Sequence, residues 1–520
     1  MAVLSEIIYI DILAFTVSIF AVIVALFKWW FSYWERQGVY TPKPTIPFGN
    51  AKDIFSQKVC IGVAIKNAYD EIKSKGKKLG GLYVFGKPIF IPVDLDLVRS
   101  MLIKDFIYFT NHVNALNDET DSLTGHLFNL KGERWKNIRT RLTPTFTSGK
   151  MKMMFPTLLD CSDSLIVLVD KYIEENQPID IKDVIARFTT DIIGSCAFGI
   201  ECNSLKNPNS EFIKYGKKIF KSSVWLGLTR FATLFFPNLL IYFKIRAFSK
   251  DIFDFFKNVV TETINYREEH NVIKKDFMHM LIQLKNNVRI TEDSVGALKD
   301  INSSNNEPSL TLNELTAQVF IFFVAGFETS STTATFCLFE LARNPQLQEQ
   351  AREEVNTVLE KYDRRLTYDG VMELTYMEKC INESLRKYPP FPFHSRECTK
   401  TYKVPGTNLV LHKGASVFIP VMGIQNDAEY YPDPDKFDPE RFSEENKAKR
   451  HSAAWTPFGD GPRACIGLRF GMMQTKVGLA TLLKHFRFTL HSKTELPLCL
   501  EPKGFIISAQ KGVWLKAERI

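Results

Sequence analysis

The sequence lacks a CxxC pair, and it lacks any long run rich in glycine, serine or proline. Its nine cysteines are an odd number and lie far apart in a chain of 520 residues. Scattered cysteines of this kind indicate neither a disulfide framework nor a zinc ribbon, and they fit a reducing environment that faces the cytosol. Length alone suggests about three domains. Because no flexible linker divides the chain, we expect one large domain instead.

A strong excess of one charge is also missing. The chain has 66 lysines and arginines against 58 aspartates and glutamates, which gives a net charge of +8. This balance is too mild to be typical of nucleic-acid binding. With 45% hydrophobic and 24% charged residues, the composition is that of a globular protein able to bury a large core. The 42 phenylalanines indicate an aromatic interior or an apolar pocket.

Residues 7–27 form the most distinctive segment, because they are apolar apart from Asp11. About 20 apolar residues suffice to cross a bilayer as a helix. A cleaved signal peptide is the alternative, but it has a positive start, a shorter apolar run and small residues at the cleavage site. Here Glu6 and Asp11 make the start acidic, and Lys28 with the aromatic residues after it suits a membrane interface. A retained single transmembrane helix is therefore favoured.

This pattern predicts a division of the chain into three parts. We predict an N-terminal membrane anchor at 1–34, a proline-containing hinge at 35–50 and a large globular domain at 51–520. Positive charge after the span places that domain on the cytoplasmic side.

Most of the large domain has helical periodicity, so we expect a mainly α fold with small β-sheets. Residues 312–342 predict one long helix, with Thr311 and Glu314 as a capping box. Further expected elements are helices from Pro345, over 374–387 and over 467–485, two short strands within 78–94 about a Gly-Lys-Pro turn, a β patch within 401–421, and a solvated connection over 285–309.

The stretch Phe458-Gly-Asp-Gly-Pro-Arg-Ala-Cys465-Ile-Gly467 is the most informative part of the domain. A lone free cysteine is most often an inert core residue. Here Gly459 and Gly461 allow tight turns and a close approach of the chain to a flat ligand. The thiol lies just before a predicted helix, where unpaired amides and the helix dipole favour a thiolate.

A dinucleotide site is the rival interpretation, because GDGPRA also matches G-x-G-x-x-A. That motif follows a strand and needs an acidic residue about 20 positions later for the ribose. Pro457 and Pro462 flank the glycines, and no aspartate or glutamate occurs over 461–494. The dinucleotide interpretation fails on both points.

The spacing of Phe458, Gly461, Arg463, Cys465 and Gly467 resembles the heme-binding loop of the cytochrome P450 superfamily. The resemblance implies the cytochrome P450 fold, heme b as cofactor, and 51–520 as a heme-thiolate catalytic domain. It also implies that the Cys465 thiolate is the axial ligand of the heme iron, where it favours O–O cleavage.

A second motif is Glu383-Ser-Leu-Arg386, whose charged residues lie on one helix face. An ordinary surface ion pair is the plain alternative. The later Pro439-Glu-Arg441-Phe442 lies where the family keeps another arginine. The resemblance implies a buried Glu383–Arg386–Arg441 network that supports the heme loop.

A third motif, Ala325-Gly326-Phe327-Glu328-Thr329, lies in the long predicted helix and matches the family's oxygen-activation motif. Gly326 in mid-helix costs about 1 kcal/mol relative to alanine, which indicates a packing or functional reason. A glycine beside polar residues can open the helical ladder and admit a water or ligand. The resemblance implies that Thr329 hydrogen-bonds the oxygen being activated and that Glu328 feeds protons towards it.

A fourth motif is Trp135-Lys-Asn-Ile-Arg139, whose two end residues share one helix face. By resemblance they hold a heme propionate, since a guanidinium suits a carboxylate. Arg396 and Arg463 match two more propionate arginines. Relatives often carry arginine where this chain has His112, which puts one propionate contact in question.

Finer resemblance points to the insect family-six microsomal enzymes. It rests on Tyr33-Trp-Glu-Arg36, on Leu142-Thr-Pro-Thr-Phe-Thr-Ser-Gly-Lys150, on AGFETSSTT and on Phe393-His-Ser-Arg-Glu-Cys398. This implies a monooxygenase of the endoplasmic reticulum that inserts one oxygen atom from O2 into small lipophiles, including plant toxins and insecticides. Oxidation of endogenous hormones, fatty acids or hydrocarbons is the alternative. A heme-thiolate isomerase and a non-enzymatic heme sensor or carrier are the other candidates, and retention of Glu328 and Thr329 argues against both.

Because the dinucleotide interpretation fails, the sequence has no motif for binding NADPH, and electrons must come from another protein. The family's partner is NADPH–cytochrome P450 reductase, with cytochrome b5 as an occasional second donor. We expect the exposed members of one basic stretch to steer the reductase. The stretch comprises Lys131, Arg134, Lys136, Arg139, Arg141, Lys150 and Lys152.

An apolar substrate pocket is also implied by the resemblance. Its expected lining comes from 106–127, 220–256, 320–329, 391–394 and 504–506. The Phe/Leu-rich part around Pro237 resembles the region that dips into the bilayer in microsomal relatives, so substrates would enter from lipid.

Overall fold

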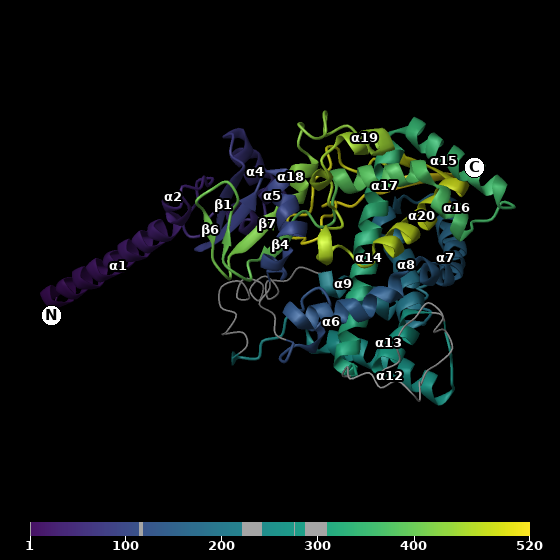
Figure 1. Cartoon of the computed structure of the whole chain (residues 1–520), viewed down its shortest axis with the longest axis horizontal. Helices are drawn as coiled ribbons and strands as arrows, with labels where there is room; N and C mark the ends of the chain where they lie inside the picture. Colours follow the sequence, from purple (N-terminus) through teal and green to yellow (C-terminus); the bar gives the residue numbers. More distant parts are fainter. Residues whose placement is uncertain (1, 114–117, 221–241, 275, 287–308) are drawn as a thin grey trace.

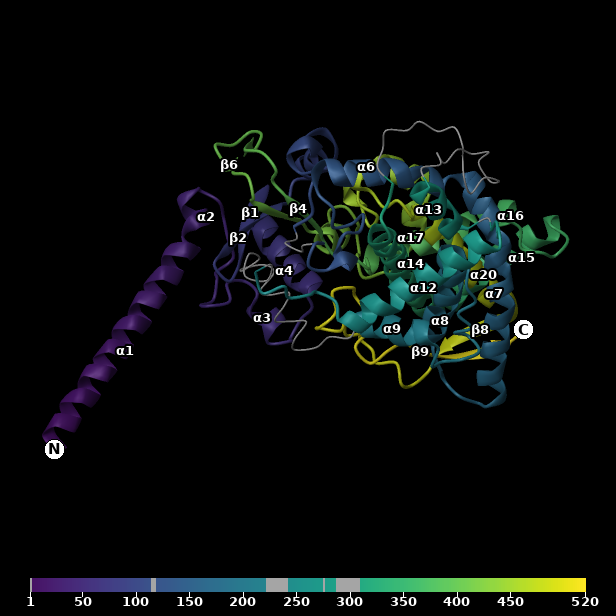
Figure 2. The same cartoon turned by 90° about the horizontal axis from the view of Figure 1, so that it is seen from below.

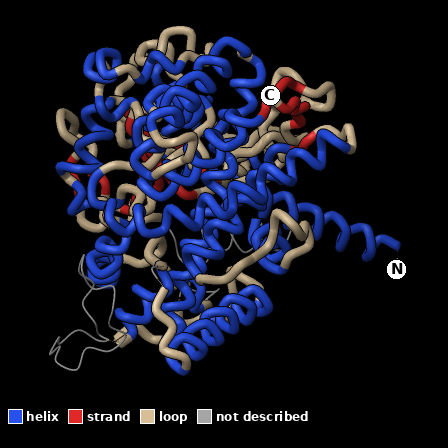
Figure 3. Tube along the Cα trace, turned by 90° about the vertical axis from the view of Figure 1, so that its right-hand side faces the viewer, coloured by secondary structure: helices blue, strands red, loops and turns tan. Residues whose placement is uncertain are grey.

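The computed structural model describes residues 2–113, 118–220, 242–274, 276–286 and 309–520. Helices form most of it, and the strands are few and short (Figure 3). The expected mainly α fold with small β-sheets is confirmed. The region around Pro237 and most of the solvated connection lie outside the described residues.

Helix α1 (Ala2–Phe31) projects from the rest of the molecule, with the N-terminus at its far end (Figures 1 and 2). An 18-residue window within Ile8–Phe31 has a mean hydropathy of 2.6 and is 0% buried. Length and composition therefore allow α1 to cross a bilayer. Among the described residues, α14 (Leu312–Arg343) passes the same test, but 67% of its window is buried, so it is a core helix.

The segment after α1 packs on the β-rich part of the molecule. In α2 (Tyr33–Arg36), the buried Trp34 donates its indole N–H to the Leu82 carbonyl at 3.0 Å and its backbone N–H to the Tyr83 hydroxyl at 2.8 Å. The Asn50 backbone N–H donates to the Tyr83 carbonyl at 2.7 Å. Residues 35–50 are thus attached to the sheet near both ends, while the division into anchor, hinge and domain stays a prediction.

Three small sheets lie at the edges of the helical body. The largest has the order β1-β2-β7-β4 and starts with the antiparallel hairpin that the sequence predicts. β5 and β6 form the expected smaller patch. The strands are β1 (Leu79–Val84), β2 (Lys87–Pro92), β4 (His394–Glu397) and β7 (Ser416–Ile419), then β5 (Tyr402–Lys403) with β6 (Val410–Leu411), then β3 (Ile179–Asp180), β9 (Trp514–Arg519) and β8 (Phe486–Leu490).

Helix α14 runs through the middle of the helical body (Figure 1). It begins after Thr311, and both halves of the predicted capping box of Thr311 and Glu314 are present. It ends at Arg343, and α15 (Pro345–Lys361) starts with proline in its first turn. Helices packed on α14 include α8 (Ile181–Ile193), α12 (Lys250–Glu269), α17 (Thr375–Lys387) and α20 (Leu468–His485). The four helices predicted from the sequence are therefore confirmed to within about two residues, the usual uncertainty of helix ends.

The other elements connect these parts. One hydrophobic core lies among the helices and a second lies against the four-stranded sheet. The remaining helices are α3 (Lys52–Phe55), α4 (Ile61–Ser74), α5 (Leu95–Arg99), α6 (Gly132–Leu142), α7 (Ser148–Glu174), α9 (Glu211–Phe220), α13 (Phe277–Lys285), α16 (Tyr368–Glu373), α18 (Val421–Gln425) and α19 (Glu444–Lys449). Short 3₁₀ or π turns are η1 (Ser100–Lys104), η2 (Phe106–Tyr108), η3 (Ser122–Thr124), η4 (Thr143–Phe146), η5 (Gly194–Phe198), η6 (Pro439–Phe442), η7 (Ser452–Ala454) and η8 (Gly461–Arg463).

Candidate heme-binding site

The loop that carries Cys465 is closed by a backbone hydrogen bond. The Cys465 N–H donates to the Phe458 carbonyl at 2.8 Å, and α20 starts three residues later at Leu468. Gly461 has a φ of +67°, and a Cβ atom there would lie 2.1 Å from the Leu102 carbonyl oxygen. No side chain fits at this position, so the glycine is required by the close approach of η1.

The Cys465 side chain is accessible although it lies within the protein. Burial raises the pKa of its thiol, and the Gly467 N–H and the Arg139 guanidinium lower that pKa in part. A thiol that is accessible and yet surrounded by protein borders an internal space. The helix start therefore offers a partial stabilisation of the thiolate, smaller than the cost of burial.

Helix α14 also borders an internal space. Ala325 is exposed even though its neighbours Phe323 and Phe327 are buried in the core. One turn later, the half-buried Thr329 donates its hydroxyl to the Ala325 carbonyl at 2.6 Å. Ala325 and Thr329 thus present small side chains on the accessible side of a core helix.

Four basic side chains from distant parts of the chain gather close to the Cys465 loop. We call Arg139, Arg396, Arg463 and His112 the basic cluster. An isolated bridge between Asn111 and Glu397 brings His112 against β4, where the Arg396 Nη1 lies 3.3 Å from His112 Nδ1.

Charge in the basic cluster is uncompensated. Burial lowers the pKa of Arg396 to about 10. Burial, and then the positive charges of Arg396 and Arg139, lower the pKa of Arg463 to about 9. Burial also holds the pKa of His112 well below its usual value. No described acidic side chain contributes to any of these shifts, so the cluster is short of an anion.

The cluster differs in how far its hydrogen bonds are satisfied. Arg463 donates to the carbonyls of Thr110 at 2.9 Å and Leu130 at 2.7 Å. The buried Nε of Arg396 has no partner among the described residues. The Arg139 guanidinium likewise forms no hydrogen bond or ion pair within the described part of the chain. Arg139 and Arg396 thus keep N–H donors free for an anionic ligand, and His112 lies next to Arg396.

The Glu383–Arg386–Arg441 residues come together in the interior. Arg386 binds Glu383 with two hydrogen bonds of 2.7 and 2.9 Å, and both side chains are 0% exposed. The Arg441 Nε lies 3.3 Å from Glu383 Oε1. Arg386 also donates to the Gln425 carbonyl at 3.0 Å. The network ties α17 to η6 and to α18, which lie beside the segment leading into the Cys465 loop.

Gly326 has a packing reason rather than an open helical ladder. Helix α14 is continuous from end to end. A Cβ atom at Gly326 would lie 2.6 Å from Cδ1 of Ile193, so the glycine lets α8 approach.

Glu328 is engaged by a residue that the sequence analysis missed. Its carboxylate lies 2.9 Å from Nζ of Lys182, at the start of α8. Because the two positions are 146 residues apart and Lys182 belongs to no motif, nothing in the sequence indicates this pairing.

Aromatic residues from the expected substrate segments meet one another and Phe128, which lies one residue beyond the expected segment 106–127. Phe391 lies 6.2 Å from Phe128 and 5.7 Å from Phe505, measured between ring centroids. His126 lies 6.2 Å from Phe320 of α14. Phe128 and Phe505 are 41% exposed, so they face an accessible space rather than the packed core. The segment 221–241 lies outside the described residues, so its expected part of the lining is not placed.

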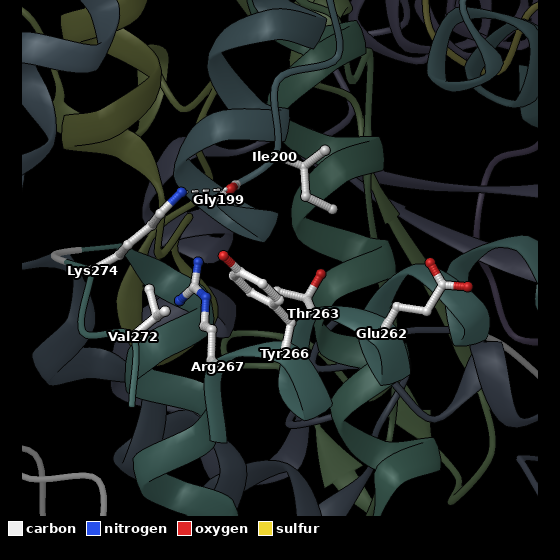
Figure 4. A pocket seen from close by; sticks show the side chains of 8 residues that line it. All are labelled: Gly199, Ile200, Glu262, Thr263, Tyr266, Arg267, Val272 and Lys274. Atoms are coloured by element: carbon white, nitrogen blue, oxygen red, sulfur yellow. Dashed lines mark hydrogen bonds between the residues drawn. The ribbon is translucent and has the colours of Figure 1, made fainter. Parts of the chain in front are cut away.

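A separate surface pocket of about 240 Å³ lies beyond η5 (Figure 4). Its residues come from the turn after η5, from α12 and from the loop after α12, including Arg267 and Lys274. Lys274 donates to the Gly199 carbonyl at 3.1 Å across it. None of the motif residues lines this pocket, so it is distinct from the site around Cys465.

The side chains available as ligands decide which metal ion or metal-containing cofactor fits the site. Within the described ranges no group of three His, Cys, Asp or Glu side chains could hold a metal ion. A single accessible thiol beside unpaired arginines instead suits an iron already held by a flat, anionic macrocycle. The residues present therefore fit heme: Cys465 would hold the iron, and the basic cluster would face the propionates.

Comparison with known proteins agrees with this geometry. The profile of the family Cytochrome P450 matches residues 42–515. The chain belongs to the cytochrome P450 family. Cytochrome P450 6a2 of Drosophila melanogaster is 40% identical over 508 residues, which cover 97% of this chain and 98% of that protein. Cytochrome P450 6A1 of Musca domestica is 41% identical over 497 residues, which cover 95% of both chains.

This P450 is therefore an oxidoreductase of the monooxygenase class, related to the insect family-six members. Heme is the cofactor that its family implies. The apolar α1 fits membrane association.

Proposed function

We propose that this P450 inserts one oxygen atom from O2 into small lipophilic foreign compounds, with electrons from NADPH that arrive through a reductase. The observation that carries the proposal is the accessible Cys465 thiol, whose pKa the Arg139 guanidinium lowers in part, together with the free donors of Arg139 and Arg396, which have no acidic partner among the described residues. Bound heme supplies the iron at which O2 is activated. One oxygen atom enters a C–H bond and the other leaves as water, which consumes two electrons and two protons.

The chain's own residues then have distinct tasks. Cys465 provides the thiolate, and Arg139, Arg396 and Arg463 offset the propionate charge. His112, which burial keeps neutral, lies beside Arg396. Trp135 supports Arg463, since the guanidinium carbon lies 4.0 Å from the indole centroid.

On the α14 side, Thr329 offers a hydroxyl beside the reacting oxygen, and the small side chain of Ala325 leaves room there. Gly326 lets α8 pack closely against this turn. Glu328 passes protons inward while its carboxylate is held by Lys182.

The electron donor in this proposal is NADPH–cytochrome P450 reductase, with cytochrome b5 as a second donor. Of the basic stretch, Lys150 is buried and so is not one of the exposed members that could steer the reductase. Arg134 and Lys152 are already paired with Asp118 and Asp369. Lys136 is exposed, forms no ion pair among the described residues, and lies on α6, which also carries Arg139. Among these residues, Lys136 is therefore the best placed to attract an acidic partner.

The location in this proposal is the endoplasmic reticulum membrane, with α1 as anchor and the catalytic domain in the cytoplasm. The aromatic group Phe128, Phe391 and Phe505 supports a lipophilic substrate, because such a wall selects by shape and apolar area. Endogenous hormones, fatty acids and hydrocarbons meet the same description, and a substrate panel separates them from foreign compounds.

The decisive experiment reconstitutes the purified holoenzyme with a reductase, NADPH and a panel of plant toxins, insecticides and endogenous lipids. NADPH-dependent, O2-dependent oxidation of the foreign compounds supports the proposal. Rearrangement of peroxides without NADPH would favour an isomerase instead. Selective turnover of one endogenous lipid would replace the detoxification role.

A further inference from the structure

The middle turn of α14 receives an unusual set of hydrogen bonds from outside the helix. The Gly326 carbonyl accepts from Nε2 of Gln474 at 2.9 Å, and the Phe327 carbonyl accepts from the Thr189 hydroxyl at 3.1 Å. The Glu328 carbonyl accepts from Nζ of Lys182 at 3.3 Å. Three consecutive carbonyls of the oxygen-activation motif are thus each bound by a side chain of another helix.

Lys182 makes the most contacts of the three donors. Besides the Glu328 carbonyl, its ammonium lies 2.9 Å from the Glu328 carboxylate and 2.8 Å from the hydroxyls of Ser331 and Thr332. Only 23% of its side chain and 13% of that of Glu328 are exposed. A partly buried ion pair with this many partners has one preferred arrangement, unlike a pair on the open surface.

Gln474 links the same turn to the heme-ligand side. It lies on α20, which starts three residues after Cys465, and it also donates to the Ser330 hydroxyl at 2.5 Å. Its Oε1 is buried with no partner among the described residues, so only the donor end of the amide is used.

The extra donors act on carbonyls that already serve the helix. Each carbonyl of a continuous α-helix accepts the N–H four residues later. A second donor tilts the carbonyl outward and loosens that bond, which bends a helix locally. Thr329 adds a fourth such bond from within, to the Ala325 carbonyl.

We propose that Lys182, Thr189 and Gln474 are positioning residues that hold the 325–329 turn of α14 in its working geometry, and that Lys182 also fixes the direction of the Glu328 carboxylate. The proposal rests on the proposed oxygen-activation role of this turn. A shift of α8 or α20 would move the carboxylate and the Thr329 hydroxyl relative to the heme without any change in the motif itself.

The test uses the holoenzyme with its reductase and compares Lys182→Met with Lys182→Arg. Loss of one charge-assisted hydrogen bond corresponds to about a tenfold effect. We therefore expect Lys182→Met to lower product formed per NADPH by about tenfold and to change the solvent deuterium isotope effect, with normal heme content. Lys182→Arg keeps a cation in reach of Glu328 and should restore most of the coupling.

Matched variants control for general damage. Lys217→Met removes a lysine that binds Asp183 on α8 at 2.8 Å but does not touch α14. Thr190→Val removes a hydroxyl that bonds only within α8, to the Ala186 carbonyl, whereas Thr189→Val removes the bond to Phe327. Thr189→Val and Gln474→Met should lower coupling, and the two controls should not.

The positioning role can also be tested by a measurement that does not require catalytic turnover. Hydrogen–deuterium exchange of the peptide that spans 325–332 should be faster in Lys182→Met than in wild type and unchanged in Lys217→Met. Wild-type coupling and exchange in Lys182→Met would overturn the inference, as would a loss of heme equal to the loss of coupling. If the wild-type protein oxidises nothing, the proposed function fails, while the exchange comparison still judges the positioning role.

Discussion

The guanidinium carbon of Arg463 lies 4.0 Å from the centre of the Trp135 indole ring. The same guanidinium donates to carbonyls of the segment that leads into α6, including Leu130 at 2.7 Å. The contact joins the Cys465 loop to α6 and so connects two motifs far apart in the sequence. A buried cation on an aromatic face contributes about 2 kcal/mol to stability. Arg139, on the same helix as Trp135, takes no part in this contact.

Trp135→Ala should therefore loosen the heme loop as well as lower stability. We expect the free energy of unfolding to fall by about 3–5 kcal/mol and heme to dissociate faster than in wild type. Urea unfolding and transfer of heme to apomyoglobin measure the two effects. Trp514→Ala is the matched control, since Trp514 also lies beside a cation, Lys493 at 4.7 Å, but on β9. If that control lost heme as readily, the specific link through Arg463 would be wrong.

Cys465→Ala should abolish the absorption band by which the reduced, carbon monoxide-bound protein reports a thiolate ligand on the heme iron. The physical reason is that no other described side chain in the loop offers a soft anionic ligand. Cys499→Ala removes the other exposed cysteine among the described residues and should leave the spectrum unchanged. An intact spectrum in Cys465→Ala would contradict the assignment of the iron ligand.

Glu383→Ala should give protein without heme. The substitution leaves Arg386 buried without its carboxylate, which costs about 3–5 kcal/mol. Heme content per protein and urea unfolding check this. Glu440→Ala, in the adjacent η6, removes an exposed carboxylate paired with Lys379 at 3.0 Å and should change stability by less than about 1 kcal/mol. Normal heme content in Glu383→Ala would refute the supporting role of the network.

Thr329→Ala should keep heme but release reducing equivalents as hydrogen peroxide. The hydroxyl at this position is the one that we expect beside the reacting oxygen, and its loss leaves the proton delivery uncontrolled. Product and hydrogen peroxide formed per NADPH are the quantities to measure. Thr333→Ala removes an equivalent hydroxyl one turn later, which donates to the Thr329 carbonyl at 2.9 Å. Equal uncoupling in both variants would argue against a special role for Thr329.

Acid should destabilise the fold through His126, which is 4% exposed. Burial lowers the pKa of His126 to about 3, from 6.5. Between these values the unfolded chain binds a proton that the folded chain does not, so stability falls as the pH decreases below about 6.5. The slope approaches about 1.4 kcal/mol per pH unit well below pH 6.5. Between pH 7 and pH 5, the loss of stability in His126→Gln should therefore be about 2 kcal/mol smaller than in wild type, as measured by urea unfolding. Parallel curves would show that His126 is not neutral in the folded protein.

Local patterns determined much of this protein in advance. The capping box at Thr311, the proline that starts α15 and the apolar run of α1 each depend on residues adjacent in the chain, so their elements could be predicted. The residues of the four motifs could be named for the same reason. Their roles still came from family resemblance and remain to be tested by the variants above.

Only the tertiary structure decided which distant side chains meet. The periodicity of the sequence cannot show that Ile193 requires the glycine at 326, that Lys182 holds Glu328, or that Lys150 is buried. Nor can it show that the basic cluster gathers without an acid. These contacts arise from how helices pack on one another, and packing depends on side chains that are more than a hundred residues apart in several of these cases.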